Sequence, residues 1–179
     1  MKKYTEINGW FDYEKTYDFL LSTMPEDGIF VECGAWLGKS SAYLCDKASL
    51  SKTIYIVDSW LGSANEIQST QKLATKTDIY NTFMNNMGNR NFIPVKMQSD
   101  QAVLEFEDES CDVVFIDMEH TYEAVKNDIQ MWLPKVKKGG YLAGHDYQSY
   151  WPGVIKAVNE NFAKDDIICM DTCWIFHKL

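Results

Sequence analysis

The chain lacks any apolar run that approaches the roughly 20 residues a membrane-spanning helix needs. Its first residues, Met1 to Glu6, read MKKYTE and are not followed by the apolar core of a signal peptide. We therefore expect no membrane partner and a cytoplasmic location.

Cysteine is scarce and follows no metal-binding or disulfide pattern. The five cysteines include no pair spaced C-x-x-C, which argues against a structural zinc site. Their odd number argues against a complete disulfide framework. We expect them to be buried free thiols.

Positive charge is also in short supply, because 17 Lys and Arg face 26 Asp and Glu and leave a net charge of -9. Nucleic-acid-binding proteins usually carry a basic face that displaces counterions, so we expect no nucleic-acid partner. The one basic cluster, Lys135 to Lys138, lies where we expect a helix to end. We interpret it as cations that complement the dipole of that helix.

The 179 residues, 46% of them hydrophobic, are enough for one well-packed core and too few for two typical domains. We therefore expect a single domain over residues 1–179. Short apolar runs alternate with longer segments of helical periodicity, which is typical of a parallel sheet covered by helices on both faces. The expected strands are Ile29–Cys33, Thr53–Asp58, Phe92–Lys96, Asp112–Asp117, Tyr141–His145, Ile167–Met170 and Cys173–His177. The last two strands are close enough to form an antiparallel hairpin.

Helical spacing of apolar residues predicts an N-terminal helical segment within residues 1–27, and further helices over Val125–Leu133 and Val154–Phe162. Residues 60–90 are polar and long for a crossover connection. We interpret this stretch as a candidate lid or cover over a binding site.

The sequence contains neither G-x-G-x-x-G nor the phosphate-binding G-x-x-x-x-G-K-[ST] motif. Instead, VECGAWLGKSS places Glu32 at a strand end, followed by Gly34, Gly38 and a helix start. Glycines allow a tight turn and a close approach to a ligand, and an acidic residue suits a ligand that is cationic at this end. A strand-to-helix turn without a ligand is the alternative.

The ends of the next two expected strands also carry polar side chains. Asp58 ends IYIVD and is placed to accept hydrogen bonds from both hydroxyls of a ribose, as acidic residues do in doubly wound sheets. Gln98, Ser99 and Asp100 follow the next strand. They either contact an adenine edge or, with Ser99 or Asp100 as an N-cap, start the following helix.

Two later strands each end in an acid and an imidazole: Asp117 with His120, and His145 with Asp146. Neighbouring parallel strands present their carboxyl ends to the same crevice, so these four side chains are expected to converge. Carboxylates there suit a hard divalent ion, and an imidazole suits a ligand or a general base. A capping Asp and a structural His are the alternative reading of each residue alone.

Four segments together resemble the class I S-adenosylmethionine-dependent methyltransferases: FVECGAWLGKSS, IYIVDSW, CDVVFIDMEHTYEAVKNDIQMWLPKVKKGGYLAGHDY and WPGVIKAV. The chain is most similar to the small O-methyltransferase-like group that contains macrolide-sugar O-methyltransferases and the cephalosporin hydroxylase family. The pairing of F-I-D-x-x-H-x-Y-E with G-H-D-Y is the specific part. The resemblance covers most of residues 28–160. It implies a three-layer Rossmann-like α/β fold with a seven-stranded, mostly parallel sheet and one antiparallel strand.

The resemblance also implies site residues. The cofactor-binding set would be Glu32, Gly34 and Gly38 at the methionine part, Asp58 at the ribose, and Ser99 and Asp117. A magnesium ion would be held by Asp117 and Asp146, with His145 where some relatives supply a further acidic ligand. His120 matches the general base of the family. Relatives often have Gly-Asp where this chain has Met118-Glu119, and we expect Glu119 to be dispensable.

The function expected from these residues is S-adenosylmethionine-dependent O-methylation of a small hydroxylated molecule, such as a sugar, a natural product or a phenol, with Mg²⁺ assistance. Substrate choice is expected in residues 60–90 and around Tyr147 to Trp151. One alternative is a nicotinamide-dependent oxidoreductase, which the missing pyrophosphate fingerprint disfavours. A second is a nucleoside-binding module without catalysis. Homodimerisation is left open.

Overall fold

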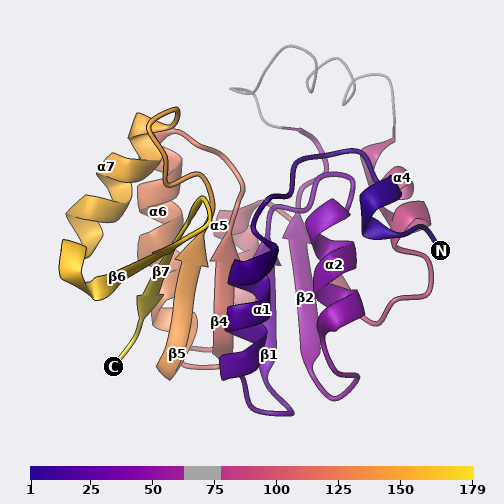
Figure 1. Cartoon of the computed structure of the whole chain (residues 1–179), viewed down its shortest axis with the longest axis horizontal. Helices are drawn as coiled ribbons and strands as arrows, with labels where there is room; N and C mark the ends of the chain where they lie inside the picture. Colours follow the sequence, from indigo (N-terminus) through magenta and orange to yellow (C-terminus); the bar gives the residue numbers. More distant parts are fainter. Residues whose placement is uncertain (63–77) are drawn as a thin grey trace.

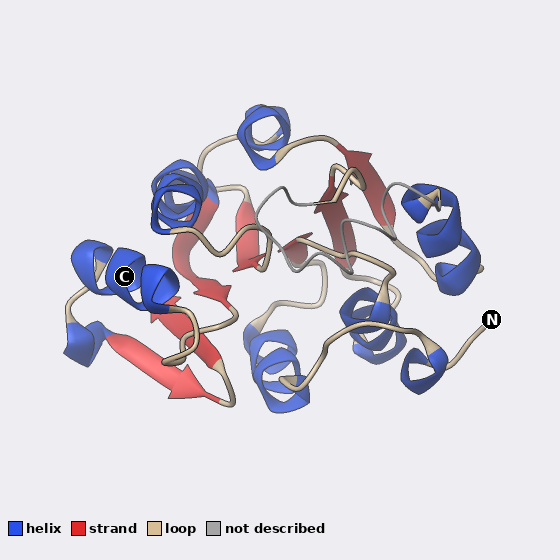
Figure 2. Ribbon diagram, turned by 90° about the horizontal axis from the view of Figure 1, so that it is seen from above, coloured by secondary structure: helices blue, strands red, loops and turns tan. Residues whose placement is uncertain are grey.

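The structure, a computed structural model, describes residues 1–62 and 78–179 as a sheet between two layers of helices (Figures 1 and 2). The strands are β1 (Ile29–Cys33), β2 (Thr53–Asp58), β3 (Ile93–Lys96), β4 (Cys111–Ile116), β5 (Val136–Gly144), β6 (Ile167–Met170) and β7 (Cys173–His177). The α-helices are α1 (Glu14–Thr23), α2 (Lys39–Lys47), α4 (Ile79–Met87), α5 (Ser99–Ala102), α6 (Tyr122–Trp132) and α7 (Pro152–Asn161). Short 3-10 turns occupy Tyr4–Glu6, Val103–Glu105, Leu133–Lys135 and Lys164–Asp166.

The seven strands are ordered β3-β2-β1-β4-β5-β7-β6. The first five are mutually parallel, and β7 runs antiparallel to both of its neighbours, β5 and β6. The expected fold is therefore confirmed, including the single antiparallel strand and the C-terminal hairpin.

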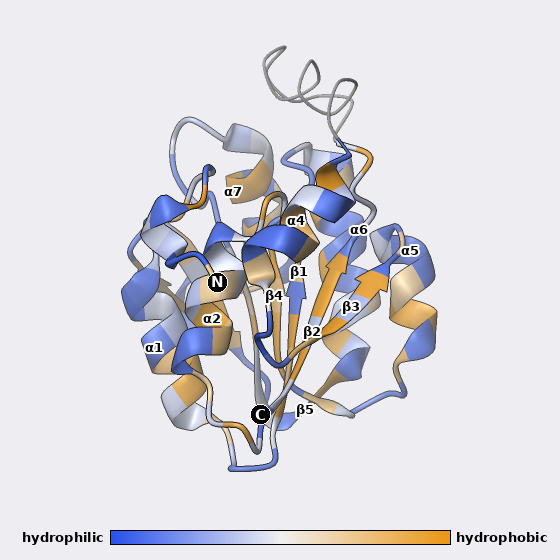
Figure 3. Cartoon of the chain, turned by 90° about the vertical axis from the view of Figure 1, so that its right-hand side faces the viewer, coloured by the Kyte–Doolittle hydropathy of each residue, from blue (hydrophilic) through white to orange (hydrophobic). Residues whose placement is uncertain are grey.

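Each face of the sheet buries alternate side chains of every strand, because successive side chains point to opposite sides. Phe30 and Phe115 pack with α1, α2 and α4, whereas Val31 and Val114 pack with α5, α6 and α7. Both faces are covered, so β4 is buried at all six positions and is apolar except for Asp112. Figure 3 shows the hydrophobic residues concentrated along the strands between helices of mixed hydropathy.

The structure corrects the interpretation of the basic cluster, Lys135 to Lys138. Helix α6 ends at Trp132, a 3-10 turn reaches Lys135, and strand β5 begins at Val136, five residues before the expected start. The Nζ atom of Lys137 contacts Oδ2 of Asp112 at 2.7 Å, so this lysine pairs two strands rather than complementing a helix dipole. The early start of β5 was not predicted because Gly139 and Gly140 interrupt the apolar pattern of the strand.

Only part of the predicted cover at residues 60–90 can be placed, because residues 63–77 lie outside the described residues. Trp60 is buried and donates its Nε1–H to the Trp36 carbonyl at 3.1 Å. Helix α4 buries Phe83 and Met87 in the core. These flanking residues therefore belong to the body of the domain. Among the described residues, no helix has the length and apolar character to span a membrane.

Candidate functional site

A pocket of about 610 Å³ opens at the carboxyl ends of the parallel strands. Ligands in open α/β sheets bind at this edge, and the volume lies in the range of small-molecule sites. The lining residues include ten that the sequence pattern indicated: Gly34, Asp58, Gln98, Asp117, Glu119, His120, His145, Asp146, Tyr150 and Trp151. The pocket therefore gathers side chains from the ends of the strands β1 to β5.

The turn after β1 is shaped by backbone conformations that side chains rarely adopt. Gly34 has a φ of +99°, and a Cβ there would lie 1.9 Å from the carbonyl oxygen of Asp117. Gly34 therefore lets the ends of β1 and β4 meet at the floor of the pocket. Gly38, with a φ of +91°, starts α2, and a Cβ there would meet the Phe83 ring at 3.0 Å. Gly38 faces α4 and is not among the lining residues.

Asp58 lies at the end of β2 and organises the wall of the pocket on the side of the glycine turn. Its Oδ2 accepts hydrogen bonds at 2.9 Å from the backbone N–H groups of Ala35 and Trp36, and its Oδ1 accepts one at 2.7 Å from Trp60. Burial raises the pKa of Asp58, opposed by these three donors. Carboxylate oxygens have further lone pairs, so Asp58 can still accept from a ligand.

Besides Gly38, two further residues of the predicted cofactor-binding set, Glu32 and Ser99, are not among the residues that line the pocket. Glu32 is completely buried, and its carboxylate accepts hydrogen bonds from the hydroxyls of Tyr17 and Ser41. Burial raises the pKa of Glu32 to about 7 against these donors. The hydroxyl of Ser99 donates to Oδ1 of Asp128 at 2.5 Å and accepts from Nε1 of Trp132 at 2.8 Å. Both residues are thus engaged in internal contacts, and direct cofactor contact by either stays a prediction.

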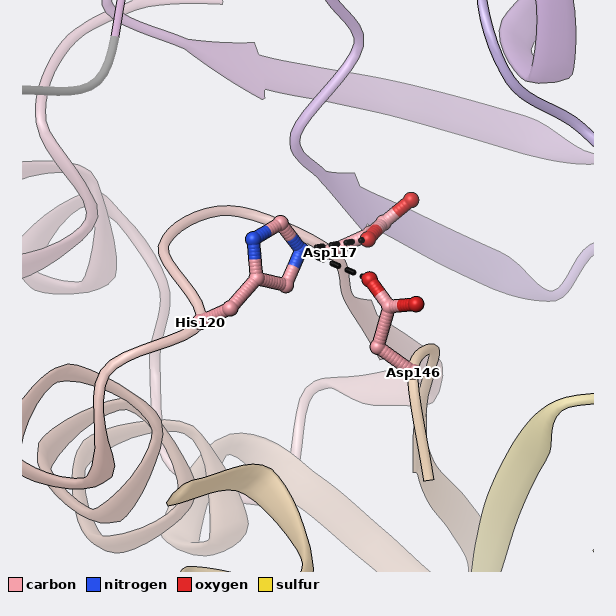
Figure 4. A group of neighbouring side chains, drawn as sticks. All are labelled: Asp117, His120 and Asp146. Atoms are coloured by element: carbon pink, nitrogen blue, oxygen red, sulfur yellow. Dashed lines mark hydrogen bonds and ion pairs between the residues drawn. The ribbon is translucent and has the colours of Figure 1, made fainter. Parts of the chain in front are cut away.

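Asp117, His120 and Asp146 converge at the pocket floor, as Figure 4 shows. The Nε2 atom of His120 lies 3.4 Å from Oδ1 of Asp117 and 2.9 Å from Oδ2 of Asp146. One ligand atom from each of these three residues lies within 4.8 Å of the others, so the group could hold a metal ion. Two carboxylates and one imidazole are a donor set that suits a divalent cation.

His145 reaches the same two carboxylate oxygens from a different position. Its Nδ1 lies 3.3 Å from Oδ1 of Asp117 and 3.4 Å from Oδ2 of Asp146. Its Nε2 lies 3.1 Å from Oδ1 of Asp12 and 2.9 Å from the hydroxyl of Thr172. His145 is therefore placed beside the metal-ligand group and is tied to an acid outside it.

The electrostatics of the cluster follow from these contacts. Burial alone would raise the pKa of Asp117, but His145 and His120 hold it well below its usual range. Burial would likewise lower the pKa of His120, but Asp117 and Asp146 raise it to about 10. Asp146 behaves like Asp117, with its pKa lowered to about 2 by the two imidazoles against the effect of burial. The cluster is thus built to hold positive charge between two carboxylates.

Backbone strain supports a functional role for the same region. Asp146 has a φ of 60°, which is left-handed and uncommon for residues other than glycine. Trp36, which also lines the pocket, has a φ of 48°, whereas Trp60, Glu109 and Asp171 have positive φ values and are not among the lining residues. Such outliers cost free energy and gather at binding and catalytic sites.

Sequence reasoning missed the contribution of the N-terminus. Residues 8–12, which we call the N-terminal strap, all line the pocket between the 3-10 turn at Tyr4–Glu6 and α1. The hydroxyl of Tyr13 donates to Oδ2 of Asp117 at 3.0 Å. The ring of Tyr13 packs in the core. The strap meets strand ends that are far away in the sequence, so no local pattern predicts these contacts.

Comparison with known proteins identifies a family and a relative by sequence. A family model described as a methyltransferase domain matches residues 31–147. The uncharacterised protein R132 of Acanthamoeba polyphaga mimivirus is 29% identical over 147 residues, which cover 79% of this chain. The chain spans 62% of the length of that curated relative.

Solved structures share the fold at low sequence identity. The O-methyltransferase NovP matches with a TM-score of 0.66 and 18% identity, over 92% of this chain and 78% of NovP. The TDP-rhamnose 3'-O-methyltransferase CalS11, an enzyme in calicheamicin biosynthesis, matches with a TM-score of 0.59 and 13% identity, over 92% of this chain and 76% of CalS11. The chain therefore belongs to the methyltransferase-domain family and has the class I S-adenosylmethionine-dependent methyltransferase fold.

Proposed function

We propose that this chain transfers a methyl group from S-adenosylmethionine to an oxygen of a small hydroxylated molecule. The observation that carries the proposal is the convergence of Asp117, His120 and Asp146 in the same pocket as Asp58 and Gly34. The cofactor supplies an already activated methyl group, so the protein has to align the acceptor and remove its proton.

The pocket divides into two ends by the strands that form them. Gly34 and Asp58 end the adjacent strands β1 and β2, and we assign this end to the cofactor, with Asp58 at the ribose hydroxyls. Asp117 and Asp146 follow the adjacent strands β4 and β5, and we assign this end to the acceptor. Because β1 also pairs with β4, the two ends are contiguous.

Proton removal falls to His120 in this proposal. Its raised pKa of about 10 means that it is protonated at neutral pH while the two carboxylates depend on it for charge compensation. Asp117 and Asp146 would hold a Mg²⁺ ion, which would supply that compensation in place of His120 and would make a neighbouring hydroxyl more acidic. The Nε2 atom of His120 lies at the acceptor end, where a neutral His120 would accept the proton of the acceptor hydroxyl. His145, bonded to Asp12 and Thr172, keeps both carboxylates oriented.

The partner in this proposal is a small molecule rather than a nucleic acid or a membrane. The net charge of -9 opposes binding of a polyanion.

A methyl-transfer assay tests the proposal. The chain is incubated with S-adenosylmethionine labelled on its methyl group and a panel of small phenols, sugars and amines, with Mg²⁺ or with a chelator. We expect label on a hydroxyl oxygen, in amounts that fall at least tenfold with the chelator. Transfer to amine nitrogen alone would overturn the assignment of oxygen as the acceptor atom.

A further inference from the structure

Two aromatic side chains of the pocket have no role in the chemistry above. Trp10 and Tyr150 line the pocket, yet they are 64% and 71% exposed. Large apolar rings left in water forgo the free energy of burial, and their gathering at one pocket indicates a surface that a ligand covers. Tyr150 lies on the segment that follows β5, next to Trp151, and Trp10 lies on the N-terminal strap between Gly9 and Asp12.

Tyr150 is connected to the carboxylate pair through stacked rings. Its ring meets Trp151 edge-on at 5.2 Å between centroids, and Trp151 stacks on His120 at 4.4 Å. Gly153 lets the segment that carries Tyr150 and Trp151 approach the loop at His120 closely. A Cβ at Gly153 would lie 2.8 Å from the backbone nitrogen of Tyr122. The packing of Trp151 and the close approach at Gly153 therefore fix the position of the Tyr150 ring.

Trp10 lies two residues before Asp12, which contacts the other histidine of the cluster, His145. The strap is held on one side of Trp10 by Lys39, whose Nζ donates to the Gly9 carbonyl at 3.1 Å. On the other side, Oδ1 of Asp12 lies 3.1 Å from Nε2 of His145. No other ring packs against Trp10 among the residues that the structure describes. An exposed ring on an anchored strap is pre-positioned for a ligand at little entropic cost.

We propose that Trp10 and Tyr150 are specificity-determining residues that bind the flat apolar face of a ring-shaped acceptor while its hydroxyl points to Asp117 and Asp146. The inference rests on the proposed function, because it takes this end of the pocket as the acceptor site. The ligand class is a hydroxylated ring, either an aromatic ring or a sugar with an apolar face. Aromatic side chains recognise both through their π-faces.

A binding experiment on the full chain loaded with S-adenosylhomocysteine tests the inference. The probes are catechol for the aromatic class and methyl rhamnoside for the sugar class, each titrated by calorimetry in the presence of Mg²⁺. The variants are Trp10→Ala and Tyr150→Ala, with Leu104→Ala as the control. Leu104 is 79% exposed and is not among the residues that line the pocket. Thermal unfolding of each variant shows whether it is folded.

We expect at least one probe to bind the loaded chain and to bind at least fivefold more weakly to both aromatic variants, with no change in Leu104→Ala. The probe that binds identifies the ring class. Unchanged probe affinity in either aromatic variant would overturn the inference, as would failure of both probes to bind a loaded chain. A Trp10→Ala variant that loses S-adenosylhomocysteine instead would place this ring at the cofactor. A wild-type chain that binds no S-adenosylhomocysteine would contradict the proposed function itself.

Discussion

The Nε2 atom of His120 lies 2.9 Å from Oδ2 of Asp146. This charged contact joins the segments that follow two adjacent strands, β4 and β5. His145 approaches the same carboxylate oxygen from its own strand end at 3.4 Å. This arrangement gives Asp146 two cationic neighbours and explains its lowered pKa against the effect of burial. The first two predictions follow from it.

Replacing His120 by Asn should lower the rate of methyl transfer by about 10² to 10⁴, the usual contribution of a general base. Affinity for S-adenosylmethionine should stay within twofold, because His120 lies at the acceptor end. Single-turnover methyl transfer and calorimetry measure the two quantities separately. Glu119→Gln serves as the comparison, since Glu119 also lines the pocket. A large loss in Glu119→Gln with little loss in His120→Asn would move the role of base to Glu119.

Replacing Asp146 by Asn should weaken Mg²⁺ binding at least tenfold, because one of two charged oxygen ligands becomes a neutral amide. Titration calorimetry with Mg²⁺ alone measures this without any acceptor. The surface variant Glu123→Gln, which changes an exposed acid in the first turn of α6, is the matched control for lost negative charge. Equal Mg²⁺ affinity in both variants would remove Asp146 from the metal site.

The buried Glu32 makes a prediction about stability and pH. Its pKa rises from the usual 4.5 to about 7 on folding, through burial. Below pH 4.5 the group is protonated in both states. Between 4.5 and about 7 only the unfolded chain releases the proton, so stability falls by up to about 3 kcal/mol and then levels off.

Glu32→Gln should abolish that part of the pH dependence. Urea unfolding at pH 5 and pH 8 measures it, and the difference between wild type and variant cancels the contribution of all other titrating groups. Parallel pH profiles of the two proteins would show that Glu32 is not buried as described.

The glycine turn predicts a contrast between two alanine substitutions. Gly34 and Gly139 both have positive φ values, +99° and +79°, so both substitutions carry a similar backbone penalty. Only at Gly34 would the new Cβ meet the Asp117 carbonyl, at 1.9 Å, whereas nothing lies within 4 Å at Gly139. Gly34→Ala should therefore lose at least about 2 kcal/mol more stability than Gly139→Ala. Equal melting temperatures of the two variants would contradict the close approach of β1 and β4.

The sheet and the acidic strand ends could be predicted from sequence because both depend on local pattern. Apolar runs marked the strands, and the carboxyl-edge rule brought Asp117 and Asp146 to one crevice without further information. The residues around them depend on contacts between distant parts of the chain. Asp12 meets His145 and Tyr13 meets Asp117 only once the N-terminal segment has folded across the sheet, and no periodicity encodes that path.

The same limit explains the residues whose surroundings differ from expectation. Glu32 ends a strand next to the glycine turn, as a cofactor ligand would, but Tyr17 and Ser41 take up its carboxylate. Ser99 follows a strand end in the same way and is engaged by Asp128 and Trp132. Sequence position placed these side chains near the site. It could not show which of two neighbouring surfaces each one faces.

Binding of the cofactor is the central claim, and calorimetric titration of the chain with S-adenosylmethionine and, separately, with NAD tests it most directly. We predict saturable one-to-one binding of S-adenosylmethionine and no measurable binding of NAD, because the chain lacks the pyrophosphate-binding glycine pattern. Saturable binding of NAD without binding of S-adenosylmethionine would contradict the account.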